Sequence, residues 1–294
     1  MIIRCWGARG SVAVSGREYL KYGGDTTCLE VRTKNDEVII IDAGTGIRRL
    51  GNQLFDENHD TFHMLLTHVH WDHIMGFPFF KPLYDRNRRI IFHGSPLPNH
   101  SIEKVLASLM RDPLFPVDYG IIKGRLQYDD LHRDSFTIDS VTVTPIPLSH
   151  PNQGTGFLFS EGEVAFVFLT DNELTYRHPG GLDFEEYRSI CAGADLLIHD
   201  AEFKAGEYEQ ARRWGHSVFT DALNLALGAR VASLGLFHHN QDRTDEALDR
   251  MVEECRSRVE RDGVSMDCFA LTQDWEIVLE DGTVAGSMAR PMMI

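Results

Sequence analysis

The sequence contains no apolar run that approaches the roughly 18 residues of a membrane span, so we expect no membrane-embedded segment. Residues 1–6 lack the apolar core and the small-residue cleavage site of a secretory signal peptide, and their pattern predicts a strand. Cysteines are few, and they lie scattered, mostly within apolar patterns: Cys5, Cys28, Cys191, Cys255 and Cys268. We therefore expect reduced thiols in a cytoplasmic protein, with neither disulfides nor a cysteine-type zinc site.

Basic side chains are also scarce. The 294 residues include 44 Asp and Glu but only 29 Lys and Arg, which gives a formal net charge of −15. Because phosphate backbones are bound by clustered cations, this balance predicts against a large nucleic-acid partner. A small phosphorylated substrate remains compatible with the charge, because bound divalent metals would themselves attract a phosphate.

Internal repeats and low-complexity linkers are absent, and strand-like and helix-like segments alternate along the chain. We therefore expect one domain over residues 1–294. Residues 95–135 interrupt this alternation, because a predicted helix at 101–111 is followed by an aromatic and proline-rich segment at 114–119. We interpret this insertion either as a cover for a sheet edge or as a lid over the substrate or a dimer contact, so a homodimer is left open.

Helical periodicity is clear near the C-terminus. Asp242 or Thr244 is the expected N-cap of a long helix, and Gly263 is its expected end. Apolar residues at helical spacing predict its buried face: Leu248, Met251, Val252, Cys255 and Val259.

The densest group of polar side chains is the motif His-x-His-x-Asp-His, which follows an apolar run. Residues two apart in an extended segment point to the same side, so His68 and His70 can bind one ion together. Asp72 and His73 follow where the strand gives way to a predicted helix at about 72–84, and we expect them to face a second ion. Imidazole and carboxylate ligands without thiolate indicate a hydrolytic zinc, manganese or iron site.

This motif resembles the signature of the metallo-β-lactamase superfamily. The resemblance implies an α/β fold, a four-layer αβ/βα sandwich with the site at one edge of its two sheets. That family completes its site with a histidine, an aspartate and a histidine, each at the end of a later strand. The sequence offers His150, Asp171 and His238 in that order, each after an apolar or β-branched run, with His239 as the alternative to His238.

The resemblance also implies which residues bind the metals. It implies two divalent ions, with zinc preferred and manganese or iron as alternatives. In the same family, the turn that begins at Asp42 lies under the metal site, so Asp42 is expected to support the ligands. The implied ligands are His68, His70 and His150 on one ion, Asp72, His73 and His238 on the other, and Asp171 as the bridge.

A second pair of segments, Leu196–Phe203 and Trp214–Ser217, is similar to the ribonuclease Z-like phosphodiesterase branch of this superfamily. There, an acidic residue after a strand orients a histidine that protonates the leaving oxygen. The resemblance implies that Asp200 is the acidic residue and His216 the acid, because a carboxylate raises the pKa of a nearby histidine. The members of this branch that mature transfer RNA carry a separate basic arm, and no Gly- and Lys-rich excursion of that kind occurs here.

The leading hypothesis is a dinuclear metal-dependent hydrolase, a phosphodiesterase that acts on small or short phosphodiesters such as a cyclic nucleotide. A hydroxide held between the metals would be the nucleophile, and Asp72, His216 and Asp200 are the predicted catalytic residues. Two alternatives remain open. One is a thioester or lactam hydrolase on the same scaffold, and the other is a metal-holding binding or sensor protein without turnover.

Overall fold

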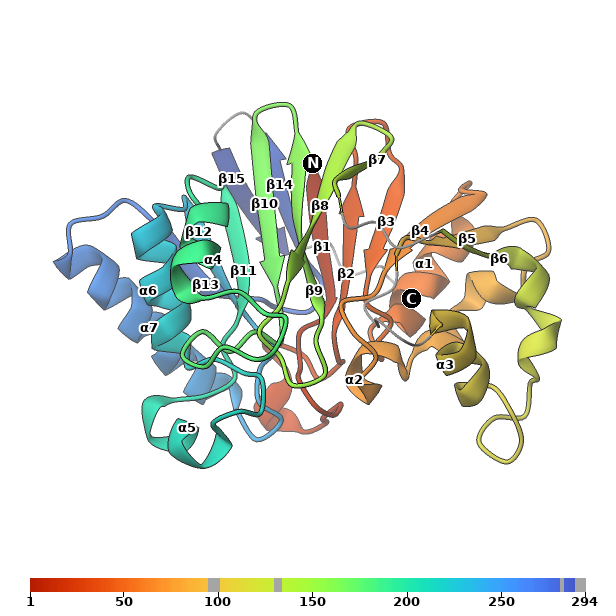
Figure 1. Ribbon diagram of the computed structural model, residues 1–294, viewed down its shortest axis with the longest axis horizontal. Coiled ribbons are helices and arrows are strands. Elements are labelled where there is room, and N and C mark those ends of the chain that lie inside the picture. The colour runs from red at the N-terminus through yellow and green to blue at the C-terminus, as the bar shows by residue number, and fades with distance from the viewer. Residues whose placement is uncertain (95–100, 130–133, 281–282, 289–294) are drawn as a thin grey trace.

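The protein is a sandwich of two β-sheets that face each other, with helices on both outer faces (Figure 1). The computed structural model describes residues 1–94, 101–129, 134–280 and 283–288. Parts of the predicted insertion, residues 95–100 and 130–133, lie outside this description. Within the described residues, no helix combines the length and the apolar character needed to cross a membrane.

The first sheet has eight strands in the order β15-β14-β1-β2-β3-β4-β5-β6. Strands β3 to β6 run parallel to one another, and the other neighbours are antiparallel. The bounds are β1 (Ile2–Gly7), β2 (Cys28–Arg32), β3 (Val38–Ile41), β4 (Thr61–Leu65), β5 (Arg89–Phe92), β6 (Leu126–Tyr128), β14 (Trp275–Glu280) and β15 (Thr283–Met288).

The second sheet has seven strands in the order β13-β12-β11-β10-β9-β8-β7. Strands β10 to β13 are parallel, whereas β7 to β10 are antiparallel neighbours. As a result, β8, β10, β11 and β12 all run in the same direction. The bounds are β7 (Phe136–Ile138), β8 (Val141–Pro147), β9 (Thr155–Glu161), β10 (Val164–Leu169), β11 (Leu196–Asp200), β12 (Ser233–Phe237) and β13 (Asp267–Ala270).

Helices cover the outside of both sheets. Helices α1 (Ile47–Asp56) and α3 (Ile102–Leu109) pack on the first sheet, and α4 (Phe184–Ile190), α6 (Phe219–Ala229) and α7 (Asp245–Arg261) pack on the second. The short helices α2 (Trp71–Ile74) and α5 (Ala205–Ala211) lie at the lower edge in Figure 1. The remaining turns are 3₁₀ helices at Arg17–Tyr19, Phe77–Phe79, Lys81–Tyr84, Tyr119–Ile121 and Lys123–Arg125.

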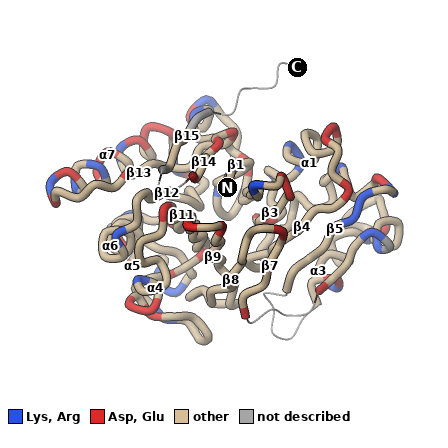
Figure 2. Tube along the Cα trace, turned by 90° about the horizontal axis from the view of Figure 1, so that it is seen from above, with Lys and Arg blue, Asp and Glu red and all other residues tan. Residues whose placement is uncertain are grey.

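The core between the sheets follows from side-chain alternation along the strands. Leu29 and Val31 of β2 face Phe159, Phe166 and other apolar residues of the second sheet, and all four are fully buried. Charged residues lie mainly on the outer helices and on the loops at the strand ends (Figure 2). The predicted α/β sandwich is therefore confirmed.

The predicted long helix near the C-terminus is also confirmed as α7. Thr244 is its N-cap, and the Thr244 hydroxyl accepts a hydrogen bond from the backbone N–H of Ala247 at 3.3 Å. The five predicted apolar positions are all buried. In contrast, α5 was not expected from the sequence, because it is short and only Tyr208 and Ala211 pack on the core. The Glu207 carboxylate caps it by accepting a hydrogen bond from the Lys204 N–H.

The helix predicted at 72–84 is wrong in its extent. Helix α2 ends at Ile74, and two 3₁₀ turns follow it. Pro78 and Pro82 explain the difference, because proline has no N–H and its ring clashes with the carbonyl of the preceding turn. The chain therefore bends away shortly after the metal-binding motif.

The insertion packs on the first sheet as far as it is described. Its predicted helix is present as α3, and Tyr119 is buried with its hydroxyl 2.7 Å from that of Tyr128. Phe115 packs edge-on against Phe79, whereas Leu114 is exposed. Tyr119 therefore belongs to the core, and a role of this segment as a substrate lid stays a prediction.

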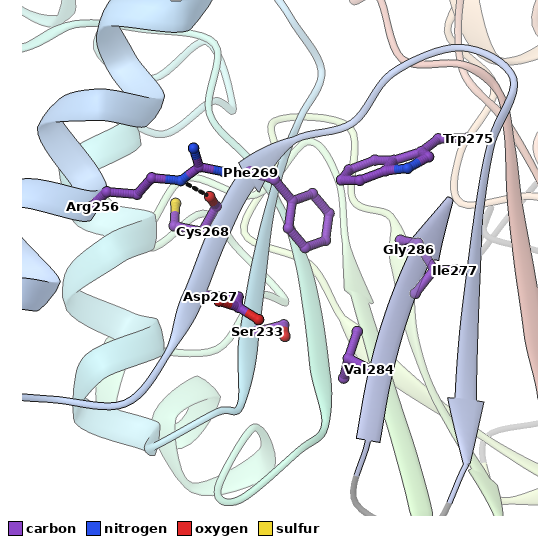
Figure 3. A pocket seen from close by; sticks show the side chains of 9 residues that line it. All are labelled: Ser233, Arg256, Asp267, Cys268, Phe269, Trp275, Ile277, Val284 and Gly286. Carbon is purple, nitrogen blue, oxygen red and sulfur yellow. Dashed lines mark hydrogen bonds between the residues drawn. The ribbon is translucent and has the colours of Figure 1, made fainter. Parts of the chain in front are cut away.

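A pocket of about 190 Å³ lies at the side of the sandwich where β13 and β15 are the edge strands (Figure 3). The rings of Phe269 and Trp275 meet edge to face in its lining, with their centroids 4.6 Å apart. Ser233, at the start of β12, also lines it. The pocket therefore extends from the starts of β12 and β13 to Trp275, and it contains none of the residues described next.

Candidate metal centre

The predicted site residues come together where several strands end. His150 follows β8, Asp171 follows β10, Asp200 ends β11 and His238 follows β12. These four strands run in the same direction, so their ends meet at one edge of the second sheet. The segment after β4 brings His68 to the same place from the first sheet. The site is therefore built across the mouth of the sandwich.

Backbone strain marks three strand ends beside the site, those of β3, β10 and β12. Asp42, Asp171 and His238 have φ values of 63°, 49° and 55°. Residues other than glycine rarely adopt positive φ, and such outliers cluster at functional sites. The abrupt turn after each strand directs the side chain into the site.

The first group of side chains consists of His68, His70, His150 and Asp171. Each offers one ligand atom, and these atoms all lie within 4.8 Å of one another. Nε2 of His68 and Nε2 of His150 are buried, and neither has a hydrogen-bond partner among the described residues. Burial lowers the pKa of His150 to about 3 and also lowers that of His68, which favours the neutral rings, whose free nitrogen lone pair can bind a metal.

The second group consists of Asp72, His73 and His238. A third potential group overlaps both and contains the Asp200–His216 pair together with Asp171 and His238. Nε2 of His238 lies 3.1 Å from Oδ2 of Asp72, and Nε2 of His73 lies 3.3 Å from the same oxygen. Asp171 lies between the two groups. Its Oδ1 is 3.2 Å from His73 and 3.3 Å from His238, while its Oδ2 is 3.4 Å from His68.

These seven residues fit two divalent ions. Buried imidazole nitrogens that have no hydrogen-bond partner in the described part of the chain converge with two carboxylates, and nitrogen and oxygen ligands of this kind suit zinc, manganese or iron. Asp171 has one oxygen toward each group, as a bridging carboxylate requires. The structure thus brings together all seven residues that were expected from the sequence to bind metal, and their role as ligands stays a prediction.

The choice between His238 and His239 follows from their surroundings. His238 faces Asp72 and Asp171, whereas Nε2 of His239 donates to the backbone carbonyl of Leu271 at 2.8 Å. The His239 ring packs edge-on against Tyr22. His238 is therefore the member of the pair that lies in the site.

Two carboxylates orient His73 and His238 through the ring nitrogen that points away from the site. Asp42 lies 2.8 Å from Nδ1 of His73, and Glu202 lies 3.0 Å from Nδ1 of His238. A carboxylate accepts hydrogen bonds, so each Nδ1 carries the proton and each Nε2 is left to face a metal. Asp42 was expected, but Glu202 was missed. Its signal in the sequence was its position two residues after Asp200, which places both side chains on the same side of an extended segment.

The support from Asp42 gives a first prediction. In the wild type, the Thr67 N–H donates a hydrogen bond to Oδ1 of Asp42 at 2.8 Å, and in Asp42→Asn the side-chain oxygen of the asparagine can still accept it. Asparagine also tolerates the positive φ at this position. The amide replaces the acceptor that faces His73, so we expect metal affinity to fall about 10- to 100-fold. Competition with a chelator measures the affinity. Asp36→Asn, at an exposed aspartate with φ 69°, is the matched control, and equal affinities of the two variants would contradict the role of Asp42.

His216 lies beside the metal ligands, as the sequence analysis expected. Its Nδ1 is 2.7 Å from Oδ2 of Asp200, and its ring stacks on that of His238 with the centroids 4.7 Å apart. Burial lowers the pKa of His216, but the nearby carboxylates of Glu202 and Asp200 outweigh burial and raise it to about 9. These carboxylates therefore favour the protonated imidazole, whose Nδ1 lies 3.9 Å from Oδ2 of Asp171.

Comparisons with known proteins agree with this geometry. The family model described as the beta-lactamase superfamily domain matches residues 37–239. Ribonuclease Z of Haloarcula marismortui is 24% identical over 287 residues, which covers 85% of this chain and 87% of that protein.

Solved structures show the same fold. A diphosphatase from the PhnP family superposes with a TM-score of 0.67 and 15% identity, and the match covers 95% of this chain and 98% of the other. The short form of human tRNase Z superposes with a TM-score of 0.63 and 18% identity, and covers 96% and 100%.

These relatives correct one prediction. The expectation against a large nucleic-acid partner is wrong, because similar proteins are ribonuclease Z enzymes and a similar structure is a tRNase Z. The formal charge of −15 is a sum over the whole chain. It does not describe the charge beside the site, where bound cations would attract phosphate.

The family model covers more than half of the chain and includes every residue of the two ligand groups. The ligand groups, the Asp200–His216 pair and the similarity to ribonuclease Z all point to the same chemistry. The chain therefore belongs to the beta-lactamase superfamily, in its ribonuclease Z-like branch, and is a metal-dependent hydrolase.

Proposed function

We propose that the chain is a dinuclear metal-dependent phosphodiesterase that cleaves nucleotidyl phosphodiesters, with RNA among its substrates. The observation that carries this proposal is the position of His216, held by Asp200 beside the ligand groups. Similarity to ribonuclease Z supports the substrate class. Zinc is the preferred metal, with manganese or iron as alternatives.

Two divalent ions in this site would activate a water and stabilise the charge on the phosphoryl oxygens. The chain itself supplies the acid. Nδ1 of His216 is held by Asp200, which leaves Nε2 to donate a proton to the leaving oxygen. A poor alkoxide leaving group needs this proton, whereas a thioester or an activated ester leaves without it. The Asp200–His216 pair therefore favours phosphodiesters over thioesters.

The proposed chemistry acts on a single phosphodiester bond, so it applies to small phosphodiesters as well as to RNA. Cyclic nucleotides and dinucleotides therefore remain proposed substrates beside RNA. Two exposed tryptophans support a nucleotidyl group. Trp71 follows His70 directly, Trp214 lies two residues before His216, and their exposed fractions are 72% and 64%. Exposed aromatic rings stack on nucleobases.

This gives a prediction for Trp71. In Trp71→Ala, KM for a nucleotidyl p-nitrophenyl ester should rise about 5- to 100-fold, because stacking contributes roughly 1–3 kcal/mol per base. KM for methyl p-nitrophenyl phosphate, which carries no base, should change much less. Trp71→Phe keeps an aromatic face and should restore most of the loss. Equal effects on both esters would contradict base stacking at this residue.

A panel of substrates tests the function. The metal-loaded protein is incubated with bis-p-nitrophenyl phosphate, cyclic nucleotides, a short RNA, a thioester and a lactam. Turnover of the phosphodiesters supports the proposal. Turnover of the thioester or lactam alone would overturn it, and retained metal with no turnover at all would indicate a metal-holding binding protein.

A further inference from the structure

The carboxylate of Glu173 is buried two residues after Asp171, and its exposed fraction is only 1%. It belongs to none of the potential metal-ligand groups found among the described residues. A buried carboxylate is costly unless it is fully hydrogen-bonded, so its partners indicate what it does.

Glu173 accepts four hydrogen bonds, and three come from the segment that leads into His216. Oε1 accepts from the Tyr208 hydroxyl at 2.5 Å and from the backbone N–H of Arg213 at 2.8 Å. Oε2 accepts from the backbone N–H of Gly215 at 3.0 Å and from Nε2 of His178 at 2.8 Å. These four bonds fill the acceptor capacity of a carboxylate.

The segment that Glu173 holds is under strain. Arg213 has a φ of 74°, which residues other than glycine rarely adopt, and Gly215 follows at a φ of 98°, a conformation for which glycine is suited. A Cβ at Gly215 would lie 2.2 Å from Cδ2 of His150, so the backbone passes directly against a metal ligand. Hydrogen bonds to an ionised acceptor are about twice as strong as neutral ones and can keep such a turn in place.

Neighbours of Glu173 connect the same segment to the metal ligands. The backbone N–H of Glu173 donates to the Ser149 carbonyl at 2.9 Å, one residue before His150. Ser217, one residue after His216, donates its hydroxyl to the Asn172 carbonyl at 2.5 Å. The stretch from Asp171 to Glu173 is therefore the part of the chain that ties His150 and His216 to each other.

We propose that Glu173 is a positioning residue that fixes the turn at Arg213–Gly215 and thereby places His216 for proton donation to the leaving group. This inference rests on the proposed phosphodiesterase function and on the acid role of His216. Glu173 belongs to none of the potential metal-ligand groups among the described residues. Its effect on the rate passes through His216.

Glu173→Gln tests this role. Glutamine has the same size, but its NH₂ group would replace one of the two carboxylate oxygens. That group cannot accept hydrogen bonds, so the hydrogen bonds now made to the replaced oxygen would be lost. We expect unchanged metal content and a fall in kcat of about 10-fold or more for a nucleotidyl ester with an alkoxide leaving group. The fall should be much smaller with a p-nitrophenolate leaving group, which needs little protonation. Glu209→Gln, on the exposed face of α5, is the matched control and should behave like the wild type.

A double variant separates positioning from a purely structural role. If Glu173 acts through His216, Glu173→Gln should cost little further activity in a His216→Ala background, because residues that act as a unit are not additive. Additive losses, or equal losses for both leaving groups, would overturn the positioning role while His216 still passes its own test. If His216→Ala itself shows no dependence on the leaving group, the proposed acid chemistry fails instead.

A milder variant covers the case in which Glu173→Gln does not fold. Tyr208→Phe removes one donor to Glu173 and leaves the carboxylate in place. It should show a smaller loss with the same dependence on the leaving group. A folded Tyr208→Phe protein with equal losses for both leaving groups would also contradict the proposal.

Discussion

His216→Ala should lower kcat by about 100-fold or more for a nucleotidyl ester with an alkoxide leaving group, while the metal content stays the same. His216 lies beside the ligand groups, and one of its nitrogens is held by Asp200. It takes no part in the hydrogen bonds by which Asp42 orients His73 and Glu202 orients His238, so its loss should not release the metals. A p-nitrophenolate leaves without protonation, so that substrate should lose much less. Steady-state kinetics with both esters and elemental analysis of the purified variant measure the two effects.

His59→Ala is the matched control for this experiment. His59 precedes β4 at the end of the strand that lies away from the site, where it approaches Asp36 and Glu57. It should leave both rates unchanged. Equal losses for both leaving groups in His216→Ala would contradict an acid role and leave His216 as a structural residue.

The metal ligands could be predicted because metal chemistry restricts the types of residue and their spacing. His68 and His70 are two apart in an extended segment, which is enough to predict a shared ion. His150, Asp171 and His238 are far apart in the sequence, and they meet only because β8, β10 and β12 run in the same direction. No local pattern contains that information, so these three depended on the resemblance to a family.

The residues that support the site were harder to predict. Glu173 accepts hydrogen bonds from two backbone N–H groups, and every residue except proline offers such a donor, so they leave no mark in the sequence. The helix expected at 72–84 was wrong in its extent because Pro78 and Pro82 lie within that range and cannot continue a regular helix. The expectation against a large nucleic-acid partner failed because it rested on the net charge of the whole chain, which does not show where the charged residues lie.

Asp171→Asn should have the largest effect of any single substitution in the site. The side chain keeps its size, and asparagine tolerates the φ of 49° at this position, so the backbone turn after β10 is preserved. The amide cannot offer one anionic oxygen to each ligand group, as the carboxylate does toward His68 on one side and His73 on the other. We expect about two divalent ions per chain in the wild type and fewer in the variant, measured by elemental analysis at saturating metal.

Activity should fall together with the metal. Because the Asp171 carboxylate would hold the ions and not the leaving group, we expect kcat of Asp171→Asn to drop by at least about 100-fold for alkoxide and nitrophenolate esters alike. This equal loss distinguishes it from His216→Ala. Asp139→Asn is the matched control, because Asp139 has a φ of 51° but lies in the exposed turn between β7 and β8, at the opposite end of the strand from His150. Two ions and full activity in Asp171→Asn, or one ion or none in the saturated wild type, would contradict a dinuclear centre bridged by this residue.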